Sequence, residues 1–248
     1  MAVLIQLLQI LDDWTLHLEE GGQFDVIYTD FEKAFDKVPH KRLISKLYSY
    51  GINQDVVLWI EAFLINRKQR VQVNDQFSSW SNVISGIPQG SILGPLLFII
   101  YINDLIDACH NSALFLYADD SKIYKYVTEY KHCLELQEDI DNLNQWADDW
   151  KLKLNVSKCS VVSYGRTISF NYDYSLSGTS LQRVDTIKDL GVTFDSKLKF
   201  NKHVDIKVNV AYQNLGIIKR NFTHLTPDCF ILLYKCLVRS HIEYGNSV

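Results

Sequence analysis

Hydrophobic and polar positions along the chain follow two periods, and each change of period marks the border of an expected element. In residues 2–18, apolar side chains recur every three or four positions, which predicts an amphipathic helix stopped by Gly21-Gly22. Residues 24–30, FDVIYTD, are rich in β-branched and aromatic side chains and predict a short strand. Residues 92–102 are almost wholly apolar, which predicts a buried helix with Ser91 as N-cap and Pro95 in its first turn.

The same two periods predict the remaining elements. Helices are expected over residues 41–50, 54–65, 129–150, 201–220 and 228–241, and strands over residues 70–73, 77–83, 161–164, 169–176 and 191–194. Residues 113–127 comprise an apolar strand, a tight turn at Asp119-Asp120 and a second strand, which predicts a β-hairpin. Strands and helices around an antiparallel hairpin predict an α+β fold in one continuous chain without linkers or repeats.

Composition supports a folded chain and excludes several classes of protein. The chain has 248 residues, of which 47% are hydrophobic and 22% charged, with only 4 Pro and 11 Gly. It is therefore long enough to bury a core and is neither disordered nor fibrous. Its five cysteines are widely spaced and form no Cys-x-x-Cys pair, so we expect reduced thiols.

No segment predicts an association with membranes. The apolar N-terminal residues have neither a basic region before them nor a small-residue cleavage site after them, so we expect no signal peptide. The apolar run of residues 92–102 is far shorter than the ~20 residues needed to span a bilayer. We expect an intracellular protein, in the nucleus or the cytoplasm, without a membrane partner and without an identifiable protein partner.

Charge is distributed unevenly between the two parts of the chain. Residues 1–150 carry 11 Lys and Arg against 22 Asp and Glu, a balance of −11, whereas residues 151–248 carry 14 against 7, a balance of +7. The acidic part is suited to divalent cations and the basic part to phosphates. On charge alone, solvated surfaces of both signs explain this distribution equally well.

Three carboxylates lie where predicted strands end. Asp30 closes the strand of residues 24–30, and Asp119 and Asp120 form the tip of the hairpin. Carboxylates brought together repel, so at least one should have a raised pKa unless a cation neutralises them. Mg²⁺ binds carboxylate and phosphate oxygens, and two such ions can clamp the reacting oxygens of a phosphoryl transfer. Taken alone, however, a polar turn and a solvated strand end are the favoured interpretation.

Three strings in a fixed order change that interpretation. DFEKAFD begins at Asp30, GIPQGSILGP begins at Gly86, and YADD begins at Tyr117. Together they resemble the palm motifs A, B and C of reverse transcriptases of the non-LTR, LINE-like retrotransposon type. WKLKLNVSK, ending at Lys158, and DLGVTFD, beginning at Asp189, are similar to the elements that follow in that family. Group II intron maturases match less closely, and a protein without a nucleic-acid role would leave all three strings to chance.

The resemblance implies an RNA-directed DNA polymerase that transfers deoxynucleotidyl groups from dNTPs to a primer 3′-hydroxyl. Its partners would be an RNA template and a DNA primer, and its cofactors two Mg²⁺ ions, with Mn²⁺ as a substitute. Asp30 and Asp119 would ligate both ions, Asp120 would be a more peripheral carboxylate, and the backbone carbonyl of Phe31 would complete a metal site. Lys158 matches the family lysine that assists departure of pyrophosphate, with a solvated lysine as the alternative.

The resemblance also implies how the nucleotide is held. Phe35 falls where the family places the bulky side chain that packs beneath the incoming sugar and excludes a 2′-hydroxyl, and a core phenylalanine is the alternative. Gln89 and Gly90 belong to the loop that would position the nucleotide and the template. Lys33 and Asp36 are expected to make structural pairs rather than to take part in chemistry.

The implied fold is a polymerase palm, an antiparallel sheet with helices on one face, followed by a helical thumb in a right-hand architecture. We expect a remnant of the fingers or a connecting helix in residues 1–23, the palm in 24–196, and thumb and post-thumb helices in 197–248. Basic side chains of the thumb would contact phosphates, and two aromatic ones would lie against sugars or in the core: Lys197, Lys199, Lys202, Lys207, Lys219 and Arg220, with Tyr212 and Phe222. Most of the fingers is expected to be missing, so the alternative function is a catalytically inactive nucleic-acid-binding remnant.

Overall fold

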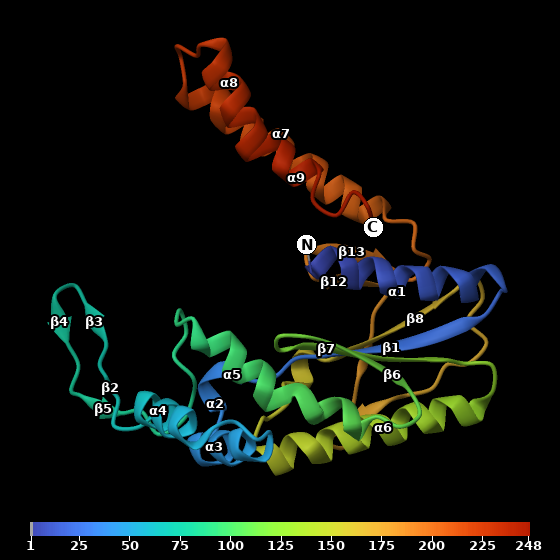
Figure 1. Ribbon diagram of the computed structural model, residues 1–248. Coiled ribbons are helices and arrows are strands. Elements are labelled where there is room, and N and C mark those ends of the chain that lie inside the picture. Colours follow the sequence, from blue (N-terminus) through green and yellow to red (C-terminus); the bar gives the residue numbers. More distant parts are fainter. Residues whose placement is uncertain (1) are drawn as a thin grey trace.

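The computed structural model describes residues 2–248, and its centre is a five-stranded sheet in the order β11-β8-β1-β7-β6 (Figure 1). The strands are β1 (Gln23–Thr29), β6 (Ala113–Tyr117), β7 (Asp120–Tyr126), β8 (Ser160–Gly165) and β11 (Gln182–Arg183). Neighbouring strands are antiparallel, except that β11 runs parallel to β8. β1 is the central strand, paired on both sides and buried at every residue. The predicted α+β class and the hairpin of residues 113–127 are confirmed.

Two hydrophobic cores cover opposite faces of this sheet. Successive side chains of a strand point to opposite faces, so Ile27 and Val26 of β1 belong to different cores. Ile27 lies in the larger core, which packs against α3 (His40–Ser49), α4 (Gln54–Leu64), α5 (Leu93–Ile102) and α6 (Tyr130–Trp150). Val26 lies in the second core, which packs against α1 (Ala2–Glu19) and a separate hairpin of β12 (Thr186–Asp189) and β13 (Val192–Asp195). Figure 1 shows these two layers on either side of the sheet.

The expectation of helices on only one face of the sheet is wrong, because α1 covers the second face. Its predicted apolar positions Leu7, Leu11 and Trp14 are buried there. The ring of Trp14 lies 4.8 Å from that of Phe24 and 4.9 Å from that of Tyr164, measured between centroids. The apolar face of α1 therefore packs against the aromatic residues of β1 and β8. Because α1 covers this second face of the sheet, β1 has no exposed residue.

A narrow arm extends outward beyond α4 (Figure 1). It consists of β2 (Lys68–Gln69) paired with β5 (Ser81–Asn82), and β3 (Gln72–Val73) paired with β4 (Gln76–Phe77). The strands predicted over 70–73 and 77–83 are thus broken into short exposed pairs, because no helix or sheet covers them.

The C-terminal helices also extend away from the sheet (Figure 1). α7 (Asn201–Asn221) packs against a returning segment of α8 (Pro227–Leu233), a π-helical stretch η3 (Tyr234–Arg239) and α9 (Ser240–Ile242). The predicted helix over 228–241 is confirmed as one helical run, and its middle, η3, is π-helical rather than α-helical. Tyr212 and Phe222, for which a core position was one alternative, are exposed.

Several short elements complete the chain. The short elements are α2 (Ala34–Lys37), η1 (Asn103–Ala108), η2 (Val156–Lys158), β9 (Ser175–Leu176) and β10 (Thr179–Ser180). All five cysteines are free thiols, as predicted. Over residues 2–248, no helix combines the length and the apolar run required to cross a bilayer.

Candidate active site

Asp30 follows directly after β1 and is held in place through its backbone. Its carbonyl oxygen accepts a hydrogen bond from the N–H of Asn155 at 2.8 Å. Its carboxylate Oδ2 lies 3.2 Å from Nζ of Lys158. That contact lacks hydrogen-bond geometry, so Oδ2 is buried without a hydrogen-bond donor. A buried carboxylate oxygen in this situation is suited to a cation.

The register between β1 and β7 brings the hairpin tip to Asp30. Thr29 of β1 pairs with Ser121 of β7, and the two hydroxyl groups are hydrogen-bonded. Asp30 follows Thr29 and Asp120 precedes Ser121, so these two residues lie opposite each other at the end of the antiparallel pair. Two residues 90 positions apart in the sequence therefore meet at one end of the sheet.

The turn of the hairpin presents the third carboxylate. Tyr117 pairs with Asp120, which leaves Ala118 and Asp119 as a two-residue connection. Ala118 has a φ of 53°, a conformation that costs a non-glycine residue on the order of 1 kcal/mol or more. The tight pairing on both sides of the turn maintains this conformation and keeps Asp119 adjacent to Asp120.

The electrostatics of the tip show that the three carboxylates interact. Burial raises the pKa of Asp120, and the charges of Asp119, Asp189 and Asp30 raise it further, while Lys122 opposes them. The prediction that one crowded carboxylate has a raised pKa is confirmed. Within residues 2–248, no three His, Cys, Asp or Glu side chains are arranged as a closed metal site. Mg²⁺ needs no such cage, since it retains waters and uses one or two carboxylates plus substrate phosphates, so this oxygen donor set fits it.

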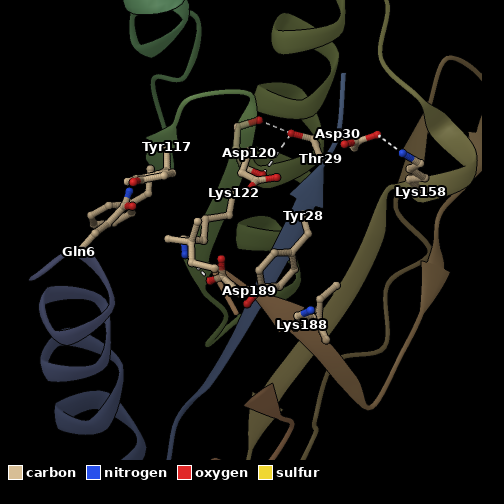
Figure 2. A pocket seen from close by; sticks show the side chains of 14 residues that line it. Gln6, Tyr28, Thr29, Asp30, Tyr117, Asp120, Lys122, Lys158, Lys188 and Asp189 are labelled. Carbon is tan, nitrogen blue, oxygen red and sulfur yellow. Dashed lines mark hydrogen bonds and ion pairs between the residues drawn. The ribbon is translucent and has the colours of Figure 1, made fainter. Parts of the chain in front are cut away.

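A pocket of about 200 Å³ opens beside these carboxylates (Figure 2). Asp30, Asp120 and Lys158 line it from the strand ends, and Lys188 and Asp189 of β12 line it from the hairpin below. The sheet end and the β12–β13 hairpin thus form two walls of one cavity. Its charged lining is suited to a phosphate-bearing substrate approached by divalent cations.

Phe31 and Phe35 take different places. Phe31 is 3% exposed and forms an isolated β-bridge with Leu154, so its side chain belongs to the core. Phe35 on α2 is half-buried and stacks on Phe98 of α5, with ring centroids 4.4 Å apart. One part of the Phe35 ring is therefore fixed by the core, and another part faces solvent.

The loop before α5 is bound to the segment that follows Asp30. The N–H of Gly86 donates to the carbonyl of Val38 at 2.8 Å, and Nε2 of Gln89 donates to Oδ1 of Asp36 at 3.3 Å. Gly86 has a φ of 88°, and a Cβ there would lie 2.6 Å from the carbonyl oxygen of Asp36, so only glycine fits. The first and second motifs are thereby joined by their backbones. The hydroxyl of Ser91 accepts from the N–H of Gly94 at 2.9 Å, although the N-cap of α5 is Ile92, one residue after the expected position.

The predicted site residues fall into two groups. Asp30, Asp120 and Lys158 line the pocket of Figure 2, whereas Gln89 lines a second, open pocket of about 710 Å³ at the base of the arm. The second pocket is also lined by Lys33, Asp36, Arg67 and Lys68. Gly90, within the second motif, is exposed at a φ of 82°. Asp36 makes the structural contact expected of it, with Gln89 as its partner.

Three charged residues of the first pocket were not predicted from the sequence. Lys122, Lys188 and Asp189 line it, and none of them was expected to be a site residue. Lys122 lies two residues after Asp120 on β7, so both side chains are on the same face of the strand. The position of Lys122 near Asp120 could therefore have been predicted from the sequence. Nothing in the sequence indicated that β12 lies opposite.

The chain is similar to known proteins both in sequence and in fold. Residues 9–194 match the family described as reverse transcriptase (RNA-dependent DNA polymerase). The chain is 30% identical to the RNA-directed DNA polymerase from mobile element jockey of Drosophila melanogaster, over 95% of this chain and 27% of that protein. It is 28% identical to the probable RNA-directed DNA polymerase from transposon X-element of the same species, over 90% of this chain and 25% of that protein. The chain spans about a quarter of the length of these relatives.

Solved structures show a similar fold. Apo telomerase from Candida tropicalis, truncated from its C-terminal domain, aligns with a TM-score of 0.54 and 13% identity, covering 81% of this chain and 39% of that one. Telomerase from Candida albicans in complex with a TWJ fragment of telomeric RNA aligns with a TM-score of 0.52 and 12% identity, covering 98% of this chain and 43% of that one. At such identities the likeness concerns the fold, which is that of a polymerase palm.

Proposed function

Because this chain belongs to the reverse transcriptase family, we propose that it carries the nucleotidyl-transfer centre of an RNA-directed DNA polymerase from a non-LTR retrotransposon. Its substrates are dNTPs and a DNA primer on an RNA template. The observation that carries the proposal is the register of β1 and β7, which sets Asp30 beside Asp120 at a pocket that Lys158 also lines. The alternative is a nucleic-acid-binding protein of this family that lacks catalytic activity, and primer extension distinguishes the two.

Asp30, Asp119 and Asp120, with the backbone carbonyl of Phe31, would hold two Mg²⁺ ions, and Mn²⁺ is the expected substitute. When bound, such ions polarise the phosphoryl oxygens and stabilise the attacking and leaving oxygens. The carboxylates supply the negative charge that binds them, and the β1–β7 register positions that charge. The buried Oδ2 of Asp30, which accepts no hydrogen bond, supports this assignment.

Lys158 is proposed to act on the leaving group. Its side chain is 66% exposed and paired only loosely with Asp30, so its ammonium is free to turn toward a departing pyrophosphate. A cation placed there offsets the charge that develops on the leaving oxygen. The exposure of Lys158 supports a mobile role of this kind better than a fixed structural ion pair.

Phe35, Gln89 and Gly90 are proposed to hold the incoming nucleotide. The stacking of Phe35 on Phe98 fixes a flat ring beneath the sugar, where it would exclude a 2′-hydroxyl. The bond from Gln89 to Asp36 keeps the loop close to the segment after Asp30, while Gly90 leaves that loop unobstructed. In this arrangement the nucleotide sits between the two pockets.

The wider architecture is proposed to follow the right-hand plan. Residues 24–196 are the palm, 197–248 the thumb and post-thumb helices, and residues 1–23 part of the fingers or of a connecting helix. The projecting α7 carries basic side chains on an exposed surface, as expected for contacts with duplex phosphates. The RNA fragment held by the Candida albicans telomerase of similar fold supports RNA as the template.

Primer extension tests the proposal. The chain is incubated with poly(rA)/oligo(dT), dTTP and Mg²⁺, alongside Asp30→Asn, Asp119→Asn and the matched control Asp148→Asn, an exposed carboxylate on α6. Extension is expected from the wild type and the control, and its loss from the other two variants. Folded wild type that binds primer-template with a steep salt dependence but does not extend it would establish the inactive alternative instead.

A further inference from the structure

Lys122 is a buried cation beside the proposed metal ligands. It lies on β7 two residues after Asp120, so both side chains leave the strand on the same face, with Cα atoms about 6.6 Å apart in an extended strand. Its neighbours across the sheet are Tyr28 on β1 and Phe115 on β6. Lys122 is only 4% exposed, so its ammonium group requires an anionic partner inside the protein.

Two carboxylates compete for that ammonium. Asp120 lies on the same strand, and Asp189 ends β12, which packs against this face of the sheet. The ammonium donates to Oδ2 of Asp189, and both partners of this ion pair are buried. Figure 2 shows the contact below Asp120. Among the ion pairs of residues 2–248, none involves Asp120.

We propose that Asp189 keeps Lys122 away from Asp120 and so leaves Asp120 available to a divalent cation. The inference rests on the proposed function, since it takes Asp120 as a metal ligand. Without the charge of Asp189, the carboxylate that shares the strand face and the pocket with the buried ammonium is Asp120. An ammonium paired with Asp120 competes with the metal for the same carboxylate. Asp189 is therefore a positioning residue that acts through Lys122.

The binding of Mn²⁺ alone to the full chain, followed by electron paramagnetic resonance, tests this role. Asp189→Asn is expected to weaken Mn²⁺ binding about tenfold, because a unit charge within a few ångströms changes a carboxylate's affinity for another cation by roughly that factor. The double variant Lys122→Met with Asp189→Asn lacks the competing ammonium and is expected to bind Mn²⁺ like the wild type. Removing both partners of a buried ion pair also spares the fold an unpaired charge, so Lys122→Met alone separates the two roles. A merely structural pair predicts that Lys122→Met loses stability in urea and Mn²⁺ affinity together, whereas the positioning role predicts Mn²⁺ binding at least as tight as in the wild type.

A matched control breaks an ion pair on the same strand at a distance from the tip. Nζ of Lys125 on β7 lies 3.0 Å from the carboxylate of Glu135 on α6, so Glu135→Gln is expected to leave Mn²⁺ binding unchanged. Unchanged binding in Asp189→Asn, or equally weak binding in Asp189→Asn and the double variant, would overturn the proposal. If Asp189→Asn does not fold by circular dichroism, Lys122→Met decides: it is expected to bind at least as tightly as the wild type, and weaker binding overturns the proposal.

Asp119→Asn separates a failure of this inference from a failure of the proposed function. Loss of Mn²⁺ binding in Asp119→Asn supports the carboxylate site. The Asp189 variants then test only whether Asp189 positions Lys122. Equal Mn²⁺ binding by the wild type and Asp119→Asn would remove the metal site of the proposed function, and the positioning role with it.

Discussion

Asp25 offers the sharpest test of what stabilises the central strand. It lies in the middle of β1 and is fully buried. Its Oδ1 accepts hydrogen bonds from Oγ of Ser163 at 2.5 Å and from Nε2 of Gln23 at 3.1 Å, and its Oδ2 accepts one from the hydroxyl of Tyr174 at 2.9 Å. The guanidinium of Arg183 lies 3.9 Å from Oδ1 and supplies the opposite charge. The carboxylate thus links two neighbouring strands to the loop before β9.

Asp25→Asn is expected to lower the free energy of unfolding by about 3–5 kcal/mol. An amide presents one acceptor oxygen and two N–H donors, so the bonds to both carboxylate oxygens cannot all survive. Hydrogen bonds to a charged group contribute about 1.5–3 kcal/mol, and removing one partner of a buried ion pair costs about 3–5 kcal/mol. Arg183 would be left facing a neutral amide.

Urea denaturation followed by circular dichroism measures this loss. Tyr174→Phe is the matched control, because it removes one donor and leaves the carboxylate with its other partners, at a smaller cost of about 1.5–3 kcal/mol. A loss of less than about 1 kcal/mol for Asp25→Asn would refute the reasoning, since it would show that the network does not depend on a carboxylate.

Three further predictions follow from other contacts. Trp14→Ala removes the fully buried ring that fixes α1 on the sheet and is expected to cost about 3–5 kcal/mol; a melting temperature equal to that of the wild type would contradict this. Burial lowers the pKa of Lys46, although its pair with Asp104 partly opposes the shift. The folded chain therefore releases this proton at a lower pH than the unfolded chain, so the wild type gains stability as pH rises from the folded pKa toward about 10.4. Lys46→Met is expected to lack that gain in stability. If the free energy of unfolding changes with pH equally in Lys46→Met and in the wild type, the prediction is wrong. Phe35→Val removes the ring beneath the proposed sugar site and is expected to raise incorporation of UTP relative to dTTP in primer extension; an unchanged ratio would assign Phe35 to the core alone.

Elements whose signals are local were predictable from the sequence. The helix expected over 129–150 is observed over Tyr130–Trp150, because its apolar positions keep helical spacing until Lys151 adopts a left-handed φ of 61°. The hairpin of residues 113–127 likewise follows from alternation on both sides of a polar turn. The three ordered motifs contain Asp30 and Asp120, which line the first pocket, and Gln89, which lines the second. Alternation alone did not show that Asp30 and Asp120 meet.

Features that depend on distant partners were not predictable in the same way. β12 lacks a clear alternation of apolar and polar residues, and its two-stranded hairpin with β13 forms no ladder with the main sheet. The ion pair of Lys122 and Asp189 joins residues 67 positions apart. The sequence around a charged residue does not show which distant residue it pairs with. The helix that covers the second face was predicted as a helix, but its place on the sheet depends on the tertiary contacts of Trp14.

The position of β1 has a consequence for how the protein opens. A strand that is hydrogen-bonded on both edges and buried on both faces exchanges its amide hydrogens only when the whole domain unfolds. The amides of β1 should therefore be among the slowest to exchange with deuterium, while those of the exposed arm exchange early. Asp30 stands at the end of this strand, so local fraying elsewhere in the chain would leave its backbone in place.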